Sequence, residues 1–114
     1  MTDPSFAPLG VFEEQIVVAV LRTRDEAYGM AVRREIERVT GRELAIGAVY
    51  ATLDRLEAKR LLASRRVLAE GPSRRVFAVT PAGARALTDT RAMRERLWHG
   101  VDLGGLLALA RGAG

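Results

Sequence analysis

The sequence contains no cysteine and only one histidine, His99, in 114 residues. Without cysteine the chain has no disulfide framework, no thiolate metal site and no cysteine nucleophile. The single histidine excludes a histidine-rich metal site and any serine–histidine pair that does not include His99. The acidic neighbours Glu13 and Glu14, and Glu35 and Glu37, are typical of solvated helix faces. We therefore predict a protein that is not an enzyme and needs no cofactor or metal ion.

Long apolar stretches are missing as well. No run of about 18 apolar residues occurs, so no membrane-spanning helix and no membrane partner are predicted. Residues 1–10 lack a basic stretch followed by an apolar run, so no secretory signal is expected. A chain of this length forms one domain and buries roughly 65% of its unfolded surface. These features predict a cytoplasmic globular protein.

Lysine is nearly absent, because arginine supplies all but one of the 18 basic residues and Lys59 is the exception. With 14 acidic residues the formal net charge is +4. The segment from Arg42 to Arg75 holds eight basic and four acidic residues, so it carries the whole excess. A basic segment on a small domain indicates a polyanionic partner, most often nucleic acid. A solvated face without a partner has the same composition and stays open as an alternative.

Apolar residues at helical spacing predict three helices in the first half of the chain, over residues 9–24, 28–40 and 46–59. Their apolar stripes are Phe12, Ile16, Ala19 and Val20; Val32, Ile36 and Val39; and Val49, Leu53 and Leu56. Gly41 is expected to end the second helix. Because few residues separate the second and third helices, they predict a helix-turn-helix.

The pattern then changes to two short strands, over residues 62–68 and 74–79, joined by turn-forming residues 70–73. In the second strand Val76 and Ala78 are expected on one face and Phe77 and Val79 on the other. Thr80 as N-cap and Pro81 as first residue predict a final helix to about residue 98 or beyond. The order predicts a mainly α fold with a small β-hairpin: a winged helix-turn-helix with a C-terminal dimerisation helix. Its parts are an extended lead (1–8), the winged helix-turn-helix (9–80), the C-terminal helix (81–102) and a tail (103–114) whose state is left open.

The third helix has the candidates for contact with DNA off its buried stripe. They are Ala48, Tyr50, Ala51, Thr52, Arg55 and Lys59. The alanines let the helix approach base edges in a major groove about 12 Å wide, while Thr52 and Arg55 reach bases or phosphate. For Tyr50, packing against the second helix is an equal alternative. For Arg55 the alternative is an ion pair with Asp54, Glu57 or another acid.

The hairpin, or wing, has two arginine pairs, Arg65 with Arg66 and Arg74 with Arg75, on either side of its turn. Adjacent residues of a strand point to opposite faces, so we expect about half of the four to contact phosphate. The alternative is that these charges protect an edge strand from aggregation.

A set of residues spread over most of the chain resembles the PadR family of transcriptional regulators. The set is Tyr28-Gly29, Thr40-Gly41, Gly47-Ala48-Val49-Tyr50, Leu53, Arg55-Leu56-Glu57, Leu61, Arg74-Arg75, Phe77, Val79-Thr80, Gly83 and Leu87. The resemblance implies a cytoplasmic, homodimeric bacterial regulator, usually a repressor, that binds double-stranded DNA at an inverted repeat. It also implies release by a phenolic or lipophilic effector, and the short length is similar to the subgroup with one C-terminal helix.

The sequence departs from the family pattern at three positions. Ala45 replaces the usual Ser or Thr before the third helix, a loss of about 1 kcal/mol of capping. Ala51 stands where proline is common. Arg60 stands where glycine is frequent, and a left-handed conformation there costs roughly 1 kcal/mol or more.

The final helix carries more apolar residues than a three-helix core requires. They are Leu87, Met93, Leu97, Trp98 and Val101. Pairing with a second copy would bury them, although folding back onto the same domain is the alternative. Trp98 is either ordinary interface packing or a stacking surface for an aromatic effector. A different reading of the whole chain is a winged-helix module that binds protein without specific DNA binding; the basic hairpin argues against it.

Overall fold

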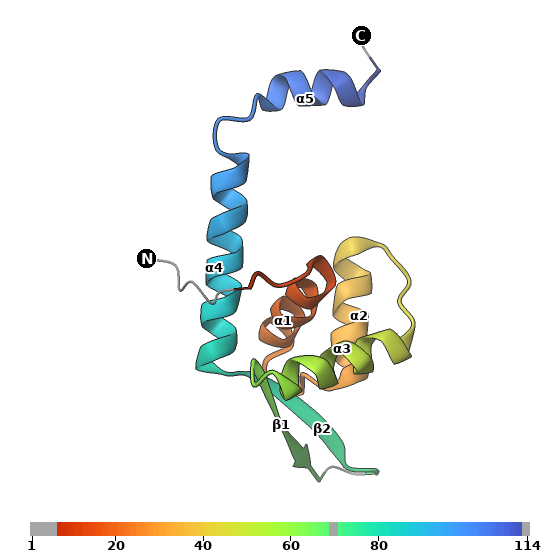
Figure 1. The fold of residues 1–114 in the computed structure, drawn as a ribbon. Helices are drawn as coiled ribbons and strands as arrows, with labels where there is room; N and C mark the ends of the chain where they lie inside the picture. Colours follow the sequence, from red (N-terminus) through yellow and green to blue (C-terminus); the bar gives the residue numbers. More distant parts are fainter. Residues whose placement is uncertain (1–6, 69–70, 113–114) are drawn as a thin grey trace.

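The computed structural model describes residues 7–68 and 71–112. The elements in chain order are α1 (Val11–Thr23), the 3₁₀ turn η1 (Arg24–Glu26), α2 (Gly29–Thr40), α3 (Ile46–Ala58), β1 (Leu62–Val67), β2 (Arg74–Val79), α4 (Pro81–Trp98) and α5 (Leu103–Ala110) (Figure 1). The predicted mainly α fold with a β-hairpin is confirmed. The predictions for residues 1–6 of the lead, for Glu70 in the hairpin turn and for residues 113–114 of the tail lie outside the described residues.

The core lies where α1, α2 and α3 meet the base of the hairpin. Its largest fully buried side chains are Phe77, Ile16, Leu53, Leu56, Leu62, Val17, Val32 and Val49. The stripe predicted for α3 is confirmed, since none of its three residues is accessible to solvent. The stripe predicted for α2 is wrong at its last member, because Val39 is 56% exposed. Val39 lies past the end of the core, on the wall of an open groove between α1 and α2.

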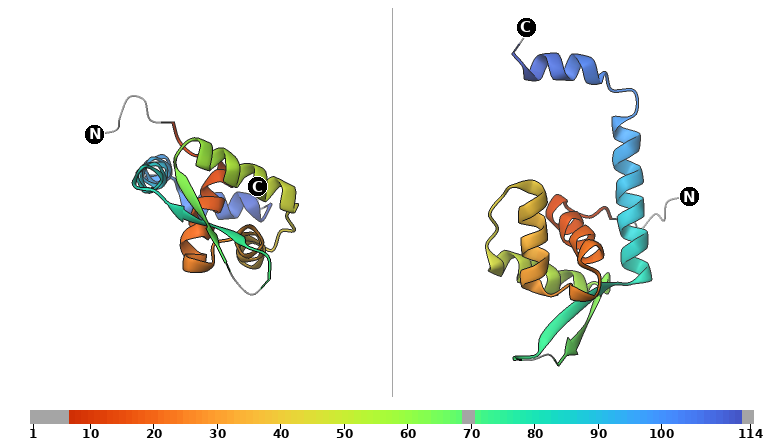
Figure 2. Two further views of the ribbon diagram at one scale, coloured as in Figure 1. Left: turned by 90° about the horizontal axis from the view of Figure 1, so that it is seen from below. Right: turned by 180° about the vertical axis from the view of Figure 1, so that it is seen from behind.

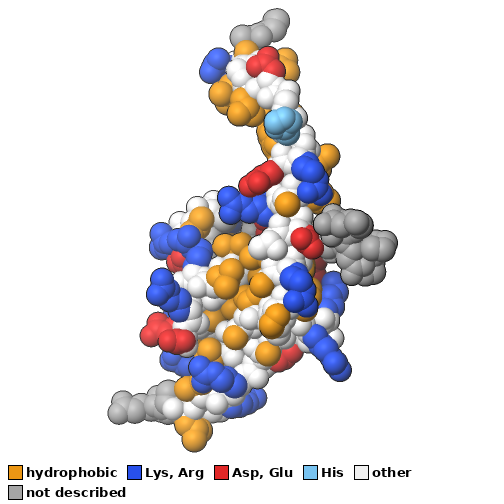
Figure 3. Space-filling model, turned by 90° about the vertical axis from the view of Figure 1, so that its left-hand side faces the viewer, with side chains coloured by type: hydrophobic (Ala, Val, Ile, Leu, Met, Phe, Trp, Pro, Cys, Tyr) orange, Lys and Arg blue, Asp and Glu red, His pale blue; other side chains and the backbone are white. Residues whose placement is uncertain are grey.

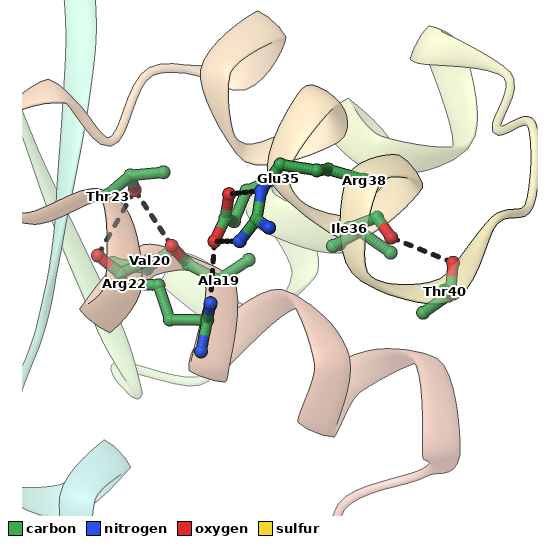
Figure 4. A network of polar contacts seen from close by, with 8 residues as sticks. All are labelled: Ala19, Val20, Arg22, Thr23, Glu35, Ile36, Arg38 and Thr40. Carbon is green, nitrogen blue, oxygen red and sulfur yellow. Dashed lines mark hydrogen bonds and ion pairs between the residues drawn. The ribbon is translucent and has the colours of Figure 1, made fainter.

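An ionic contact also joins α1 to α2 beside this groove (Figure 4). Arg22 Nε lies 2.7 Å from Glu35 Oε2, and Arg38 donates to both carboxylate oxygens of Glu35. Hydrogen bonds from Arg38 and Arg22 lower the pKa of Glu35 to about 2. Glu35 therefore remains an anion throughout the neutral range and keeps its contact with Arg22 across the two helices.

The hairpin is antiparallel, with Leu62 opposite Val79 and Arg66 opposite Arg75. The two faces predicted for β2 agree with this register, in which Val76 is opposite Arg65 and Phe77 opposite Ser64. Val76 and Phe77 are nevertheless both buried. The backbone N–H of Phe77 donates to the carbonyl of Ala27 at 2.8 Å, and β2 packs against α1, η1 and α4. At its base the strand is therefore covered on both faces and does not follow a half-buried pattern.

The junction between α3 and β1 contains the left-handed residue that the sequence suggested. Arg60 has φ +62° and follows the end of α3. The N–H of Leu61 donates to the carbonyl of Leu56 at 3.0 Å, and that of Arg60 to Glu57 at 2.9 Å. This is the hydrogen-bonding pattern of a Schellman helix end, where glycine is usual.

The C-terminal arm consists of two helices. The predicted start of α4 is confirmed, since Thr80 Oγ1 accepts from the N–H of Gly83 at 3.0 Å. α4 packs beside α1, and Thr90 Oγ1 accepts from the N–H of Leu9, just before α1, at 3.0 Å. The end of α4 extends beyond the winged domain (Figures 1 and 2). The tail is helical over α5, so the single C-terminal helix suggested by the resemblance is corrected to two. Asp102 caps this second helix through the N–H of Gly105.

Replacing Arg60 by glycine is expected to stabilise the protein. Glycine adopts positive φ without the steric cost that an L side chain carries, and this gain exceeds the destabilisation from the higher conformational entropy of an unfolded chain with glycine. We expect Arg60→Gly to raise the free energy of unfolding by about 0.5–1 kcal/mol in urea denaturation. Arg60→Ala is the control: it removes the same charge and keeps the strain, so it should give no gain. Equal stabilisation by both variants would contradict strain as the cause.

Candidate nucleic-acid interface

The outer side of α3 presents the residues that the sequence singled out, with one exception. Ala48, Tyr50, Ala51, Arg55 and Lys59 are exposed. Thr52 is only 3% exposed, so its predicted place off the core face is wrong. It lies about 60° around the helix from Val49, at the margin of the buried stripe. Thr52 is therefore unavailable for reading a base.

The middle of this outer side is a smooth strip of small residues. Gly47, Ala48, Ala51 and Ala58 are all exposed, and the charged residues Asp54 and Arg55 lie on either side of them. Without long side chains the helix backbone can approach another surface closely. The strip has the shape needed to enter a groove and few groups of its own for hydrogen bonding.

Tyr50 packs against the start of α2, which was one of its two predicted alternatives. A Cβ atom on Gly29 would overlap the Tyr50 ring and lie 2.7 Å from its hydroxyl oxygen. The absence of a side chain at Gly29 therefore lets the ring rest on α2. Tyr50 remains 39% exposed, so the same side chain also borders the outer surface.

Sequence reasoning missed a cationic cluster at the N-terminus of α2. The guanidinium carbon of Arg74 lies 4.2 Å from the centroid of the Tyr28 ring, and that of Arg34 lies 5.8 Å from it. Arg34 Nη2 also donates to the Tyr28 hydroxyl at 2.8 Å. Tyr28 belonged to the family-like motif, but nothing in the sequence pattern singled out Arg34.

A cationic hollow of about 270 Å³ lies between the start of α2 and the wing. Its lining residues are Tyr28, Gly29, Tyr50, Arg66, Ser73, Arg74 and Arg75. Arginine guanidiniums and phenol hydroxyls are donors for the oxygens of a phosphate group. The hollow therefore has the chemistry of an oxyanion site next to the strip on α3.

Within the wing, the strand register separates the four arginines as expected. Arg66 lies directly opposite Arg75, while Arg65 is opposite Val76 and Arg74 is opposite Val67. Arg65 makes no ion pair with any residue in the described part of the chain. Among the described residues, Arg66 has a single long hydrogen bond, 3.4 Å to Ser73 Oγ.

Arg75 has a different role, because it braces the wing against α3. Its Nη1 donates to Asp54 Oδ1 at 2.9 Å, and its Nη2 donates to Glu57 Oε1 at 2.6 Å. Glu57 in turn accepts from the N–H and the hydroxyl of Ser64 on β1. The hydrogen bond from the Ser64 hydroxyl, together with Arg75, lowers the pKa of Glu57. In this structure Arg75 binds two carboxylates and fixes the angle between wing and helix.

The two basic residues near the end of α3 share one acidic partner on α1. Glu13 Oε2 lies 3.1 Å from Lys59 Nζ and 3.5 Å from Arg55 Nε. Of the two roles predicted for Arg55, the structure shows the surface ion pair, and the acid comes from another helix. Both cations remain about half exposed.

The five apolar residues predicted for dimerisation fall into two groups. Leu87 packs against the core of its own domain, and Met93 is half-buried. Leu97, Trp98 and Val101 are exposed near the end of the arm, as are all four leucines of α5. No helix in residues 7–68 and 71–112 combines the length and apolar character needed to cross a bilayer.

Glu57→Gln is expected to loosen the wing and lower stability by about 1 kcal/mol, because a charged acceptor of several hydrogen bonds is lost. The folded-state pKa of Glu57 lies below its ordinary value of 4.5, so its contribution is complete above that pH and is lost on acidification. Urea denaturation at a series of pH values should therefore show a gap between wild type and variant that closes below about pH 4. Asp54→Asn, the more exposed partner of Arg75, is the control and should cost less. A gap that persists at low pH would argue against a charge effect.

Comparison with known proteins agrees with this geometry. A sequence model of the family described as "Transcriptional regulator PadR-like family" matches residues 17–89. The transcriptional regulator Rv3488 of Mycobacterium tuberculosis is 42% identical over 81 residues, which cover 71% of this chain and 74% of that protein.

Solved structures show the same arrangement. A PadR-like transcription factor from Bacteroides fragilis matches with a TM-score of 0.66 and 26% identity, over 77% of this chain and 84% of that one. A PadR family transcriptional regulator from Eggerthella lenta matches with a TM-score of 0.61 and 27% identity, over 82% and 84% of the two chains. The family match spans more than half of the sequence, and the winged helix is shared. The chain therefore belongs to the PadR-like family of transcriptional regulators, which act by binding DNA and are not enzymes.

Proposed function

We propose that the protein is a homodimeric repressor that binds an inverted-repeat operator in the cytoplasm. The observation that carries the proposal is the smooth outer strip of α3 next to the cationic hollow between α2 and the wing. A helix of this width fits a major groove about 12 Å wide, with its small residues against the base edges. Two such helices, about 34–36 Å apart in a dimer, would occupy two half-sites on one side of the duplex.

In this arrangement the cations divide into groups with different roles. Arg66 and Arg74, which both line the hollow, and Arg65, which shares the face of Arg74 in the strand register, are placed to neutralise phosphates. Arg55, beside the strip, reaches either a base edge or a phosphate. Arg75 acts indirectly by holding the wing, since its guanidinium is bound to Asp54 and Glu57. The proposal thus gives phosphate contacts to three of the four wing arginines, more than the half expected from strand alternation.

The dimer is supported by apolar surface that one protomer leaves uncovered. All four leucines of α5 are exposed, and α5 has no extensive packing against the rest of the described chain (Figure 1). An isolated helix of 8 residues is not stable in water, so α5 needs a partner surface. An apolar groove of about 270 Å³, with Val11, Val18 and Val39 among its lining residues, lies open between α1 and α2. Hydrophobic side chains also gather beside α4 on the face shown in Figure 3. In a two-fold dimer, each protomer offers its apolar surface to the exposed leucines of its partner. One symmetry axis therefore covers the leucines and the apolar groove in both copies.

Trp98 lies near the end of α4 and is 52% exposed. In the proposed dimer it comes close to the seam between protomers, where an indole can pack or can stack on a flat aromatic effector. An effector that binds better to a dimer with the wrong spacing between α3 helices would release the operator.

DNA binding is tested by fluorescence anisotropy over a series of salt concentrations, with the DNA upstream of the protein's own gene and a scrambled duplex. A dimer that neutralises about 6 to 10 phosphates should show a log–log salt slope near −5 to −9. Arg66→Ala and Arg74→Ala should each weaken binding to both duplexes and reduce the slope by about 2 per dimer. Arg91→Ala on α4 is the control. Absence of binding at low salt would favour the alternative of a protein-interaction module.

The dimer is tested by sedimentation velocity with Leu107→Glu. This change puts a charge among the exposed leucines of α5 and should raise the dimer dissociation constant at least about 100-fold. Arg111→Glu, just after α5, adds negative charge without removing an apolar contact and should leave the dimer intact. Equal dissociation of both variants, or a wild-type monomer, would contradict this interface.

A further inference from the structure

We propose that Glu13 sets the affinity for DNA by holding Arg55 and Lys59 against α1, so that DNA phosphates must displace this carboxylate to bind them. The inference rests on the proposed DNA-binding function and adds a positioning residue to it. Glu13 belongs to α1, outside the helix-turn-helix and the wing. It acts through the two cations and not by contact with DNA.

The geometry shows a fixed anion and two movable cations. Glu13 Oε1 accepts from the backbone N–H of Gly10 at 2.9 Å, which anchors the carboxylate at the first turn of α1. Its other oxygen, Oε2, lies within ion-pair distance of both Lys59 Nζ and Arg55 Nε. The Glu13 side chain is only 14% exposed, whereas those of Arg55 and Lys59 are 51% and 52% exposed. Rotation of the two long side chains is therefore the movement that breaks the contact.

The position of these cations on α3 makes the contact relevant to DNA. Arg55 lies about 120° around the helix from the buried Val49, beside the small-residue strip and on the opposite flank from Asp54. Asp54 faces the wing through Arg75. A helix in the major groove has a phosphate strand on each side. The wing supplies cations to one side, and Arg55 and Lys59 are the basic side chains that α3 offers to the other.

The strength of the contact suits competition. Half-exposed ion pairs are weak in water and are screened by salt, so a row of phosphates can replace a single carboxylate. The hydrogen bond from Gly10, followed by the contacts with Lys59 and Arg55, lowers the pKa of Glu13, which keeps it charged at neutral pH. Each protomer therefore binds DNA against a constant opposing contact, and the affinity is lower than the basic residues alone would give.

Glu14 provides a matched control at the adjacent position. It carries the same charge on the same turn of α1, but it pairs with Arg94 on α4 and not with α3. If net charge alone mattered, Glu13→Gln and Glu14→Gln would change DNA binding equally. If the release of Arg55 and Lys59 next to the DNA surface matters, only Glu13→Gln changes it.

The test compares Glu13→Gln with Glu14→Gln by fluorescence anisotropy, on the full chain and a mixed-sequence duplex of about 30 base pairs, long enough for two half-sites. Glutamine keeps a carbonyl oxygen for the N–H of Gly10 and removes only the charge. We expect Glu13→Gln to bind about 3- to 10-fold more tightly at low salt, with a salt slope steeper by about 2–4 per dimer. Glu14→Gln should match the wild type in both quantities.

A second variant makes the mechanism explicit. If Glu13 restrains Lys59, then Lys59→Gln should weaken binding more in the Glu13→Gln background than in the wild type. Unchanged or weaker binding by Glu13→Gln, with a wild type that binds the duplex, would overturn this inference alone. A wild type that fails to bind any duplex at low salt would overturn the proposed function, and the inference with it.

Discussion

The functional surface depends on the complete burial of one stripe of α3. Val49, Leu53 and Leu56 are inaccessible to solvent, packed in the core that α1, α2 and the base of the hairpin also form. Because this side of the helix is fixed inward by the hydrophobic effect, the opposite strip of small residues is fixed outward. The hairpin leaves the same core through Phe77, so wing and helix are oriented by one packing arrangement.

Around this core, ion pairs decide which cations are available to a polyanion. Arg75 is bound by Asp54 and Glu57, and Glu13 engages Arg55 and Lys59. Arg65, Arg66 and Arg74 differ, since none of them forms an ion pair with a residue that the structure describes. The basic segment that stands out in the sequence is thus a mixture of structural braces, restrained groups and accessible groups. Net charge indicates the class of partner, whereas the pairing pattern shows which cations are already engaged by carboxylates within the protomer.

The C-terminal arm differs from the winged domain, because the contacts that would stabilise its end are not made within one protomer. As far as Arg94, α4 is held to α1 and the residues just before it, by the hydrogen bond between Thr90 and Leu9 and by the pair of Arg94 and Glu14. Beyond that point the apolar side chains of α4 and α5 face solvent. Exposed leucines on a short helix are a favourable arrangement only when a second surface removes them from water. This incomplete burial is the reason for proposing a dimer. In that dimer an effector would act by changing the spacing between the two α3 helices.

The order of the elements up to α4, the buried stripe of α3, the Thr80 cap and the left-handed Arg60 could be predicted from local sequence, because helical periodicity, capping chemistry and backbone sterics act over a few residues. The sequence also indicated the family through motifs that lie within those elements. The tertiary structure alone decided that Thr52 and Val76 are buried, that Val39 borders a groove, and that α5 forms a second C-terminal helix. It alone paired Glu13 with Lys59 and Arg34 with the Tyr28 cluster. Glu13 and Lys59 are 46 residues apart in the chain, and such contacts depend on how helices cross, which no local pattern encodes.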